Sequence, residues 1–154
     1  MNVTAISAEM TAFSLFMYHE NLNRKVWYII MKKIISTTNA PAAVGPYSQA
    51  IMVGDMLFTS GQIGLDPKTG AFAGDDVVTQ AKQVCENLKA VLAEAGMTFE
   101  NVIKTTCFLA NIADFAAFNA VYADYFVSLP ARSCVAAKDL PKGALCEVEV
   151  IAVK

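Results

Sequence analysis

Arg132 is a charged residue in an otherwise apolar stretch, and its side chain is suited to binding an anion. It lies in Leu129-Pro-Ala-Arg-Ser-Cys-Val135 and is the single arginine after residue 31, where lysine occurs nine times. A guanidinium offers a planar, two-pronged set of donors that matches a carboxylate or a phosphate, which an ammonium cannot do. We therefore predict that Arg132 binds an anionic group; the alternative is a structural salt bridge.

Glu147 and Glu149 are the next candidates, because they place two carboxylates in a short apolar segment. A strand alternates its side chains, so both carboxylates would lie on one face. Two acids at the start of an apolar strand indicate that this end faces water or a pocket. A hairpin through the preceding turn would pair Glu147 with Val135. A shift of one residue would instead bring Glu147 to the face of Arg132, and the sequence leaves both registers open.

Three further residues are candidates for lining a pocket. Asn119 lies beside the apolar stripe of a predicted helix, where a buried amide must find partners, either nearby backbone or a ligand. Tyr47 follows Gly45-Pro46, a rigid loop that either holds the phenol at a site or simply packs it. Gly61 ends a predicted strand and would let a ligand approach the backbone.

The four cysteines, Cys85, Cys107, Cys134 and Cys146, lack the paired spacing of a zinc site. A domain of this size and apolarity does not depend on a disulfide framework. We expect small buried thiols in a reducing cytoplasm. Cys134 is the exception of interest, because it lies two residues from Arg132 and therefore on the same strand face.

The position of histidine limits the chemistry available to most of the chain. The one histidine, His19, and the one tryptophan, Trp27, both precede residue 31. The remaining sequence therefore excludes a Ser-His-Asp triad, a Cys-His pair and a histidine-ligated metal. Any chemistry there must use carboxylates, lysine, tyrosine, cysteine, backbone groups and Arg132.

The composition indicates one folded domain. The chain has 154 residues, of which 55% are hydrophobic and 17% are charged, so it is neither long enough to favour two domains nor polar enough to be disordered. This apolarity suggests that other subunits cover part of the surface. A net charge of −2 provides no basic field for binding nucleic acid. No run of about 18 apolar residues predicts a membrane span.

Residues 1–30 differ from the rest, and we predict that they form an extension outside a domain of residues 31–154. The segment lacks the charged start and the small-residue cleavage site of a signal peptide. One hypothesis is that Met31 is the natural start and that the extension comes from an upstream misreading of the start codon. The other is a short helix around residues 7–18 that packs on the domain.

The elements that must position the candidate residues follow from apolar periodicity and turn chemistry. Gly54-Asp55 is typical of a tight hairpin, and Asp75 or Asp76 would cap a helix that ends before Gly96. The predicted strands span 32–37, 48–53, 56–62, 101–109, 131–137 and 145–153, and the predicted helices span 76–95 and 114–126. This order predicts an α+β fold with two helices packed on one face of a mixed β-sheet.

Five motifs together resemble one known family. They are Asn39-Ala-Pro-Ala-Ala-Val-Gly-Pro-Tyr47-Ser-Gln49, Thr59-Ser-Gly-Gln-Ile63, Phe118-Asn119 leading into Tyr122, Pro130-Ala-Arg-Ser-Cys-Val135, and Glu147-Val-Glu149. The chain resembles the Rid family of reactive-intermediate (enamine/imine) deaminases, formerly described as perchloric-acid-soluble translation inhibitors. The resemblance covers about residues 32–154, and residues 1–30 match nothing in the family.

The resemblance implies a chorismate-mutase-like fold and a homotrimer whose sheets form a central barrel. Three active sites would lie in clefts between subunits, with no cofactor and no metal, in a cytoplasmic protein. Carried over by residue, the implied roles are carboxylate binding for Arg132, orientation of the attacking water for Glu147, backbone contacts to substrate for Gly61 and Cys134, and pocket walls for Tyr47 and Asn119. The link at residues 127–129 looks shorter than in many relatives, which could reshape one wall.

The implied activity is hydrolysis of 2-imino acids, such as 2-iminobutanoate and 2-iminopropanoate, to 2-keto acids and ammonia. Two other functions stay open at this point. The same clefts could hold a metabolite without turnover, in a binding module that reports its level. A ribonuclease or translation inhibitor is a third hypothesis, but the acidic composition and the absence of histidine after residue 31 oppose it.

Overall fold

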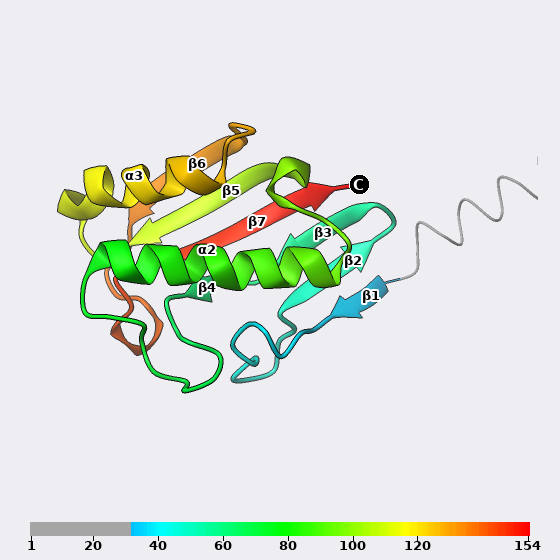
Figure 1. Cartoon of the computed structure of the whole chain (residues 1–154), viewed down its shortest axis with the longest axis horizontal. Coiled ribbons are helices and arrows are strands. Elements are labelled where there is room, and N and C mark those ends of the chain that lie inside the picture. Colours follow the sequence, from blue (N-terminus) through cyan, green and yellow to red (C-terminus); the bar gives the residue numbers. More distant parts are fainter. Residues whose placement is uncertain (1–31) are drawn as a thin grey trace, which may run out of the picture.

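The computed structural model describes residues 32–154, so the predictions for residues 1–30, including a helix around residues 7–18, lie outside the described range. Two helices pack on one face of a seven-stranded mixed sheet (Figure 1), which confirms the predicted α+β class. The strands are β1 (Lys32–Ile35), β2 (Ala50–Val53), β3 (Met56–Thr59), β4 (Gln62–Ile63), β5 (Val102–Leu109), β6 (Ala131–Ala136) and β7 (Cys146–Val153). The helices are α2 (Val77–Glu94) and α3 (Phe115–Tyr125), with short 3-10 turns at Phe99–Asn101, Ile112–Asp114 and Pro141–Gly143.

Strand β7 lies at the centre of the sheet, whose order is β1-β2-β3-β7-β5-β6, with β4 also paired to β7. All neighbours are antiparallel except β5 and β6, which are parallel because α3 carries the chain back between them. The tight hairpin predicted at Gly54-Asp55 is confirmed: Val53 pairs with Met56, and Gly54 has a φ of +58°.

The predicted hairpin between β6 and β7 is wrong, because β5 lies between them. Arg132 pairs with Thr105 of β5, and Glu147 pairs with Phe108 of the same strand. The side chains explain this order. Strand β7 is buried at every second residue and takes a position with neighbours on both sides, whereas β6 is short and largely exposed and takes the edge.

The segment predicted as one strand over residues 56–62 is divided into β3 and β4. The backbone N–H of Ser60 donates to the Gln49 carbonyl (2.9 Å), and its hydroxyl donates to the Ser48 carbonyl (2.7 Å). The N–H of Val150 donates to the Thr59 hydroxyl (2.9 Å) instead of to a neighbouring backbone carbonyl. The Thr59 hydroxyl thus replaces a backbone acceptor on the β7 side, and the pairing of β3 with β2 ends at Thr59, two residues before Gly61.

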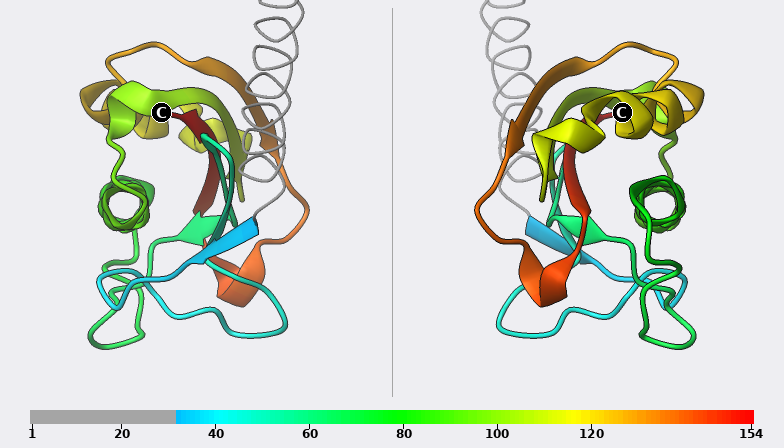
Figure 2. Two further views of the ribbon diagram at one scale, coloured as in Figure 1. Left: turned by 90° about the vertical axis from the view of Figure 1, so that its right-hand side faces the viewer. Right: turned by 90° about the vertical axis from the view of Figure 1, so that its left-hand side faces the viewer.

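The hydrophobic core lies between the helices and one face of the sheet (Figure 2). Asp76 caps α2 by accepting a hydrogen bond from the Thr79 N–H (2.9 Å), and Gly96 follows the helix with a φ of +70°. The apolar stripe of α2 is buried as predicted, through Val77, Ala81, Val84, Cys85, Leu88, Val91 and Leu92. On the opposite face of the sheet no helix lies among the described residues, and none of those helices is long and apolar enough to cross a membrane.

Candidate active site

Within one chain the six predicted site residues form two separate groups. The Arg132 group comprises Asn119, Arg132 and Cys134, on α3 and the edge strand β6. The Glu147 group comprises Tyr47, Gly61 and Glu147, around the start of the central strand β7. Asn119 and Arg132 line one hollow, all three members of the Glu147 group line another, and Cys134 lines neither.

Arg132 lies on the aromatic surface of α3. One of its Nη atoms donates to Asn119 Oδ1 (2.7 Å), so Asn119 holds the guanidinium, and both residues line the same hollow. The guanidinium carbon lies 4.6 Å from the centre of the Tyr122 ring, within range of a cation–π attraction. The Tyr122 hydroxyl is itself hydrogen bonded to the Thr105 hydroxyl (2.8 Å). This support fixes one edge of the guanidinium and leaves its other donors free.

The structural salt bridge considered for Arg132 is absent from residues 32–154, where the ion pair present joins Lys89 and Glu86. The guanidinium instead lines an open hollow of about 560 Å³. Leu129 forms part of its wall, 85% exposed and with a left-handed φ of +53°. An arginine held by neutral groups in an open hollow is suited to binding an anion from outside the chain.

Cys134 is half-buried on the same face of β6 as Arg132, and it pairs in register with Cys107 of β5. Burial raises the pKa of the Cys134 thiol, while the nearby Arg132 cation lowers it in part. The other three cysteines are buried, and burial raises the pKa of Cys107 and of Cys146 to about 12. The prediction of buried, unpaired thiols is confirmed for these three.

Glu147 is half-buried, between Phe108 of β5 and Ile63 of β4. No hydrogen bond or ion pair from residues 32–154 reaches its carboxylate. Burial raises the pKa of Glu147, and the neighbouring Glu149 raises it further. The carboxylate is therefore a better proton acceptor than a solvated glutamate, and both of its oxygens are available to water or to a ligand.

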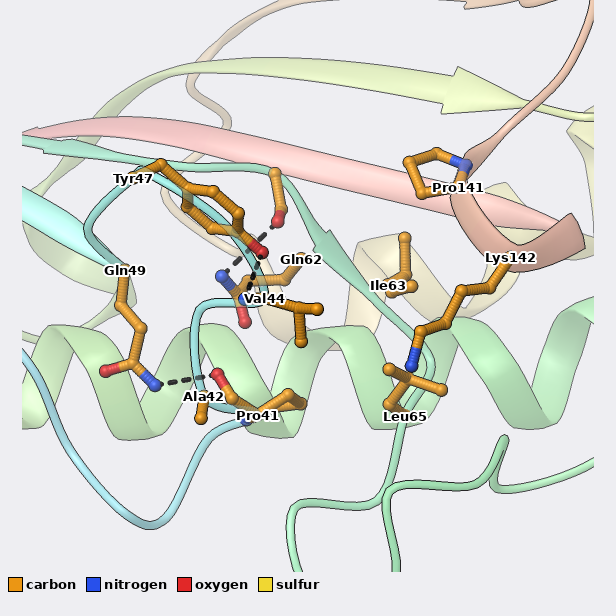
Figure 3. Close-up of a pocket in the computed structure, with 11 residues that line it drawn as sticks. Pro41, Ala42, Val44, Tyr47, Gln49, Gln62, Ile63, Leu65, Pro141 and Lys142 are labelled. Carbon is orange, nitrogen blue, oxygen red and sulfur yellow. Dashed lines mark hydrogen bonds between the residues drawn. The ribbon is translucent and has the colours of Figure 1, made fainter.

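Tyr47 reaches this group from the loop between β1 and β2. Its hydroxyl oxygen accepts a hydrogen bond from the Val44 N–H (3.1 Å), which leaves the phenolic proton free to be donated. The hollow beside it contains Glu147, Gly61 and Ser60. A second cavity of about 230 Å³ adjoins it, and Gly61 also lines this cavity. Figure 3 labels the other lining residues, which are Pro41, Ala42, Val44, Tyr47, Gln49, Gln62, Ile63, Leu65, Pro141 and Lys142.

Gln49 holds the Tyr47 loop in place and was not identified as a site residue from the sequence. Its side chain is 3% exposed; the amide nitrogen donates to the carbonyls of Pro41 (2.8 Å) and Ala40 (3.2 Å). Its amide oxygen accepts from the Thr37 N–H (2.7 Å). The sequence does place a glutamine directly after Tyr47-Ser48 and before an apolar strand. Because a buried amide needs several hydrogen-bond partners, this position could have indicated a residue that anchors the loop.

Ser60, Pro141 and Lys142 also line the two hollows of the Glu147 group without having been predicted. Ser60 could have been suspected from its place before Gly61. Lys142 belongs to a turn distant in sequence and has a left-handed φ of +57°, a conformation that the residue types alone do not reveal.

Arg132 and Glu147 are separated in one chain both along the sheet and across it. Arg132 is level with Thr105, which pairs with Val150, three residues beyond Glu147 on β7. Strand spacing and residue rise place their Cα atoms about 14 Å apart. Arg132 contacts the helices, whereas Glu147 alternates with buried Val148 and so faces the other way. The two charges do not pair with each other within the chain.

The two groups supply complementary chemistry. The Arg132 group can bind a carboxylate or a phosphate, and the Glu147 group can orient a water molecule and take its proton. No group of three or more histidine, cysteine, aspartate or glutamate side chains within residues 32–154 is arranged to hold a metal ion.

Comparison with known proteins assigns the chain to a well-populated family. The family model described as Endoribonuclease L-PSP matches residues 37–154. A mouse (Mus musculus) 2-iminobutanoate/2-iminopropanoate deaminase is 49% identical over 126 residues, which cover 81% of this chain and 93% of the relative. The structure of a Rid family protein from Yersinia pestis is 48% identical, with a TM-score of 0.78 over 80% of this chain and 100% of that one. The structure of E. coli TdcF with bound serine is 44% identical, with a TM-score of 0.76 over 79% and 98% of the two chains.

Proposed function

This chain belongs to the Rid family, and we propose that it hydrolyses reactive 2-imino acids to 2-keto acids and ammonia. The observation that carries the proposal is that Arg132 and Glu147 each line an open hollow, with no oppositely charged side chain of the described residues beside them. A 2-imino acid offers the matching groups, since it joins a carboxylate to an electrophilic carbon that water attacks. The relative named as a 2-iminobutanoate/2-iminopropanoate deaminase supports this substrate class.

In the proposed reaction Arg132 binds the substrate carboxylate, while Glu147 orients one water molecule toward the imine carbon. Glu147 accepts a proton as the water oxygen bonds to that carbon and returns it to the imine nitrogen, which gives a carbinolamine. The carboxylate then takes the proton of the new hydroxyl and passes it to the nitrogen as the C–N bond breaks, ammonia leaves and the C=O bond of the keto acid forms. Because the substrate carboxylate and the water are held in one site, a bimolecular attack becomes an effectively unimolecular step, which lowers its entropic cost. The proton transfer typically contributes about 10²- to 10⁴-fold. The imine carbon is already electrophilic, so the reaction needs no cofactor as electron sink.

The remaining predicted residues have supporting roles in this proposal. The backbone of Gly61 and of Cys134 would contact polar atoms of the substrate. Asn119 would keep the guanidinium of Arg132 flat on Tyr122, and Tyr47 would offer its free phenolic proton to the substrate. The separation of Arg132 from Glu147 by about 14 Å means that one chain does not bring these roles together.

We further propose a homotrimer, in which the Arg132 group of one copy faces the Glu147 group of the next. The sheet face that no described helix covers supports this assembly, because large apolar side chains are exposed on it. These are Ile34, Phe58 and Val135, with exposed fractions of 61%, 40% and 50%. The edge strand β6 also has no neighbour beyond it in the described sheet. Other copies would cover these apolar residues and complete three equal sites.

The cellular setting and the domain limits belong to the same proposal. Four free thiols suit a reducing compartment, and we place the protein in the cytoplasm. We also propose that residues 31–154 form the working domain and that residues 1–30 lie outside it, in keeping with the family match over residues 37–154.

The direct test is hydrolysis of 2-iminobutanoate and 2-iminopropanoate, generated in the cuvette from threonine by a dehydratase or from amino acids by an oxidase. We expect the loss of imine to accelerate with added protein, and release of ammonia to match formation of the keto acid. RNA is the appropriate second substrate, because the family model is described as an endoribonuclease. Binding of a keto acid without any turnover of imine would instead favour a metabolite-binding module.

A further inference from the structure

The carboxylate of Glu147 lies directly over the backbone of Gly61. A Cβ atom built on Gly61 would overlap Glu147 Oε1 and would lie 2.6 Å from its Cδ and 2.9 Å from its Cγ. Real Cβ atoms essentially never approach another heavy atom this closely, so no side chain fits at residue 61 while Glu147 keeps its place.

The backbone conformation does not explain the glycine. Five glycines in residues 32–154 have positive φ angles, at Gly45, Gly54, Gly70, Gly96 and Gly143, and Gly61 is not among them. An alanine could therefore adopt its φ angle without left-handed strain. What excludes a side chain at residue 61 is the space that Glu147 occupies.

The main chain on both sides of this contact is held, so a clash can be relieved only by movement of the Glu147 side chain. Ser60, just before Gly61, is anchored by its hydrogen bonds to Gln49 and Ser48. On the other side, Glu147 lies in the central strand and is paired with both β4 and β5. Because no hydrogen bond from the described residues restrains the carboxylate, its position depends on the shape of its surroundings.

We propose that Gly61 is a positioning residue for Glu147. Because Gly61 has no side chain, the carboxylate of Glu147 can lie against the Gly61 backbone, in a space that we call the seat. This proposal rests on the proposed function for its catalytic consequence. In this seat the carboxylate stays half-buried against the sheet, with its oxygens free to hold water. Burial is also the main reason that the pKa of Glu147 is raised, so leaving the seat would lower its affinity for a proton.

The test is a double-mutant cycle on the full chain, with Gly61→Ala, Glu147→Ala and the double variant. Melting temperature and ligand affinity are measured for each protein. In the Gly61→Ala protein the outer part of the Glu147 side chain must move, so the melting temperature should fall by about 2 to 4 °C. In the Glu147→Ala background the space is empty, so the same substitution should change the melting temperature by about 1 °C or less. The Glu147→Gln background keeps the clash and should behave like the wild type.

The matched control is Gly74→Ala, which also has an ordinary φ angle and a clash with one side chain. A Cβ on Gly74 would lie 2.7 Å from Cγ2 of Thr79, away from the Glu147 group. This substitution should lower the melting temperature equally whether residue 147 is glutamate or alanine. If Gly61→Ala behaves like this control, the proposal is overturned.

Binding of 2-ketobutanoate, measured by calorimetry, separates the seat from a simpler role in making room for a ligand. If Gly61 serves Glu147, adding Gly61→Ala to Glu147→Ala leaves the affinity for 2-ketobutanoate unchanged within about twofold. If the methyl group blocks the ligand itself, affinity falls in both backgrounds and the proposal fails. Should Gly61→Ala not fold alone, the double variant must fold, and failure of both overturns the proposal.

Kinetics then connect the seat to catalysis. Gly61→Ala should lower kcat about 10- to 100-fold with little change in KM, because Arg132 still binds the carboxylate while the proton acceptor is misplaced. Its acidic pH limb should move to lower pH, because a displaced Glu147 is more solvated. If the wild type hydrolyses no 2-imino acid, the proposed function fails, while the thermal cycle still decides the role of Gly61.

Discussion

The Arg132 group and the Glu147 group are built in different ways. Arg132 is exposed on an edge strand, and a hydrogen bond to Asn119 and the aromatic ring of Tyr122, both on a regular helix, fix its side chain. Glu147 is half-buried on the central strand, with no partner for its carboxylate in residues 32–154, and loops shape its surroundings. The first group is suited to holding an ion in place, and the second to changing its protonation. The proposed hydrolysis of an imino acid needs both, which is why we expect the working site to combine the two groups.

Replacing Arg132 by lysine should have the largest effect on activity. The charge is kept, but the planar fork is lost, together with its stacking on Tyr122. Losing a charge-assisted, two-pronged contact costs roughly 30- to 1000-fold in kcat/KM for 2-iminobutanoate. The measurement is steady-state imine hydrolysis, with circular dichroism and light scattering as controls for fold and assembly. Full activity in a folded Arg132→Lys protein would show that the guanidinium of Arg132 is not needed to bind the substrate.

Replacing Glu147 by glutamine should lower kcat about 100-fold, because the amide cannot accept the proton of water. Binding of 2-ketobutanoate should be nearly unchanged, since Arg132 is intact, and a calorimetric titration checks this. This contrast in kcat and binding separates the two groups. Equal losses of ligand affinity in Arg132→Lys and Glu147→Gln would show that both residues bind the ligand, and would contradict separate roles for the two groups.

The same variant tests the pKa of Glu147 through stability. Burial and Glu149 raise the folded-state pKa above the unfolded value, so the folded protein keeps a proton over a pH range where the unfolded chain has released it. Stability is therefore greater below this range and falls as pH rises through the folded-state pKa. Glu147→Gln should remove this dependence and melt about 2 °C higher at neutral pH. A lower melting temperature would show that the carboxylate stabilises the fold.

Gln49 offers a smaller effect, confined to the Glu147 group. Gln49→Glu keeps the size of the side chain but places a carboxylate against the Pro41 and Ala40 carbonyls. The loop that carries Tyr47 should loosen and raise KM roughly tenfold. Asn101→Asp is the control, because Asn101 makes a similar amide bond to Val153 at the other end of β7. An unchanged KM in Gln49→Glu would show that the loop does not depend on this anchor.

Removal of residues 1–30 should have the smallest effect. If these residues lie outside the working domain, a chain that starts at Met31 should keep its activity and its oligomeric mass. Its melting temperature should stay within about 1 °C of the full-length value. A fall of several degrees in differential scanning calorimetry would show that the extension packs on the domain.

Local signals in the sequence predicted most of the fold. The stripe from Val77 to Leu92 with Asp76 before it is a helix, and Gly54-Asp55 is a hairpin turn. The pairing of β6 and β7 was predicted incorrectly, because the choice between β5 and β6 as the neighbour of β7 depends on burial across the whole sheet. Likewise, a strand that looks continuous over residues 56–62 is interrupted by side-chain bonds to residues distant in sequence.

The candidate site was predictable as a set of residue types but not as a geometry. Arg132 and Glu147 could be selected because each is a charge among apolar neighbours. The contact between Gly61 and Glu147 joins residues far apart in the chain, and nothing local to Gly61 indicates what occupies its missing side chain. The division into two groups follows from the register of β5, β6 and β7, which depends on long-range pairing.

The most direct test of this account is to mix two inactive proteins. Arg132→Ala and Glu147→Ala chains carrying different affinity tags are expressed together, and assemblies that contain both are purified. In any mixed trimer about one site in three combines an intact Arg132 with an intact Glu147 from the neighbouring copy. The account predicts that these assemblies regain about a third of wild-type imine hydrolysis. Mixed trimers no more active than either parent would contradict a site shared between copies.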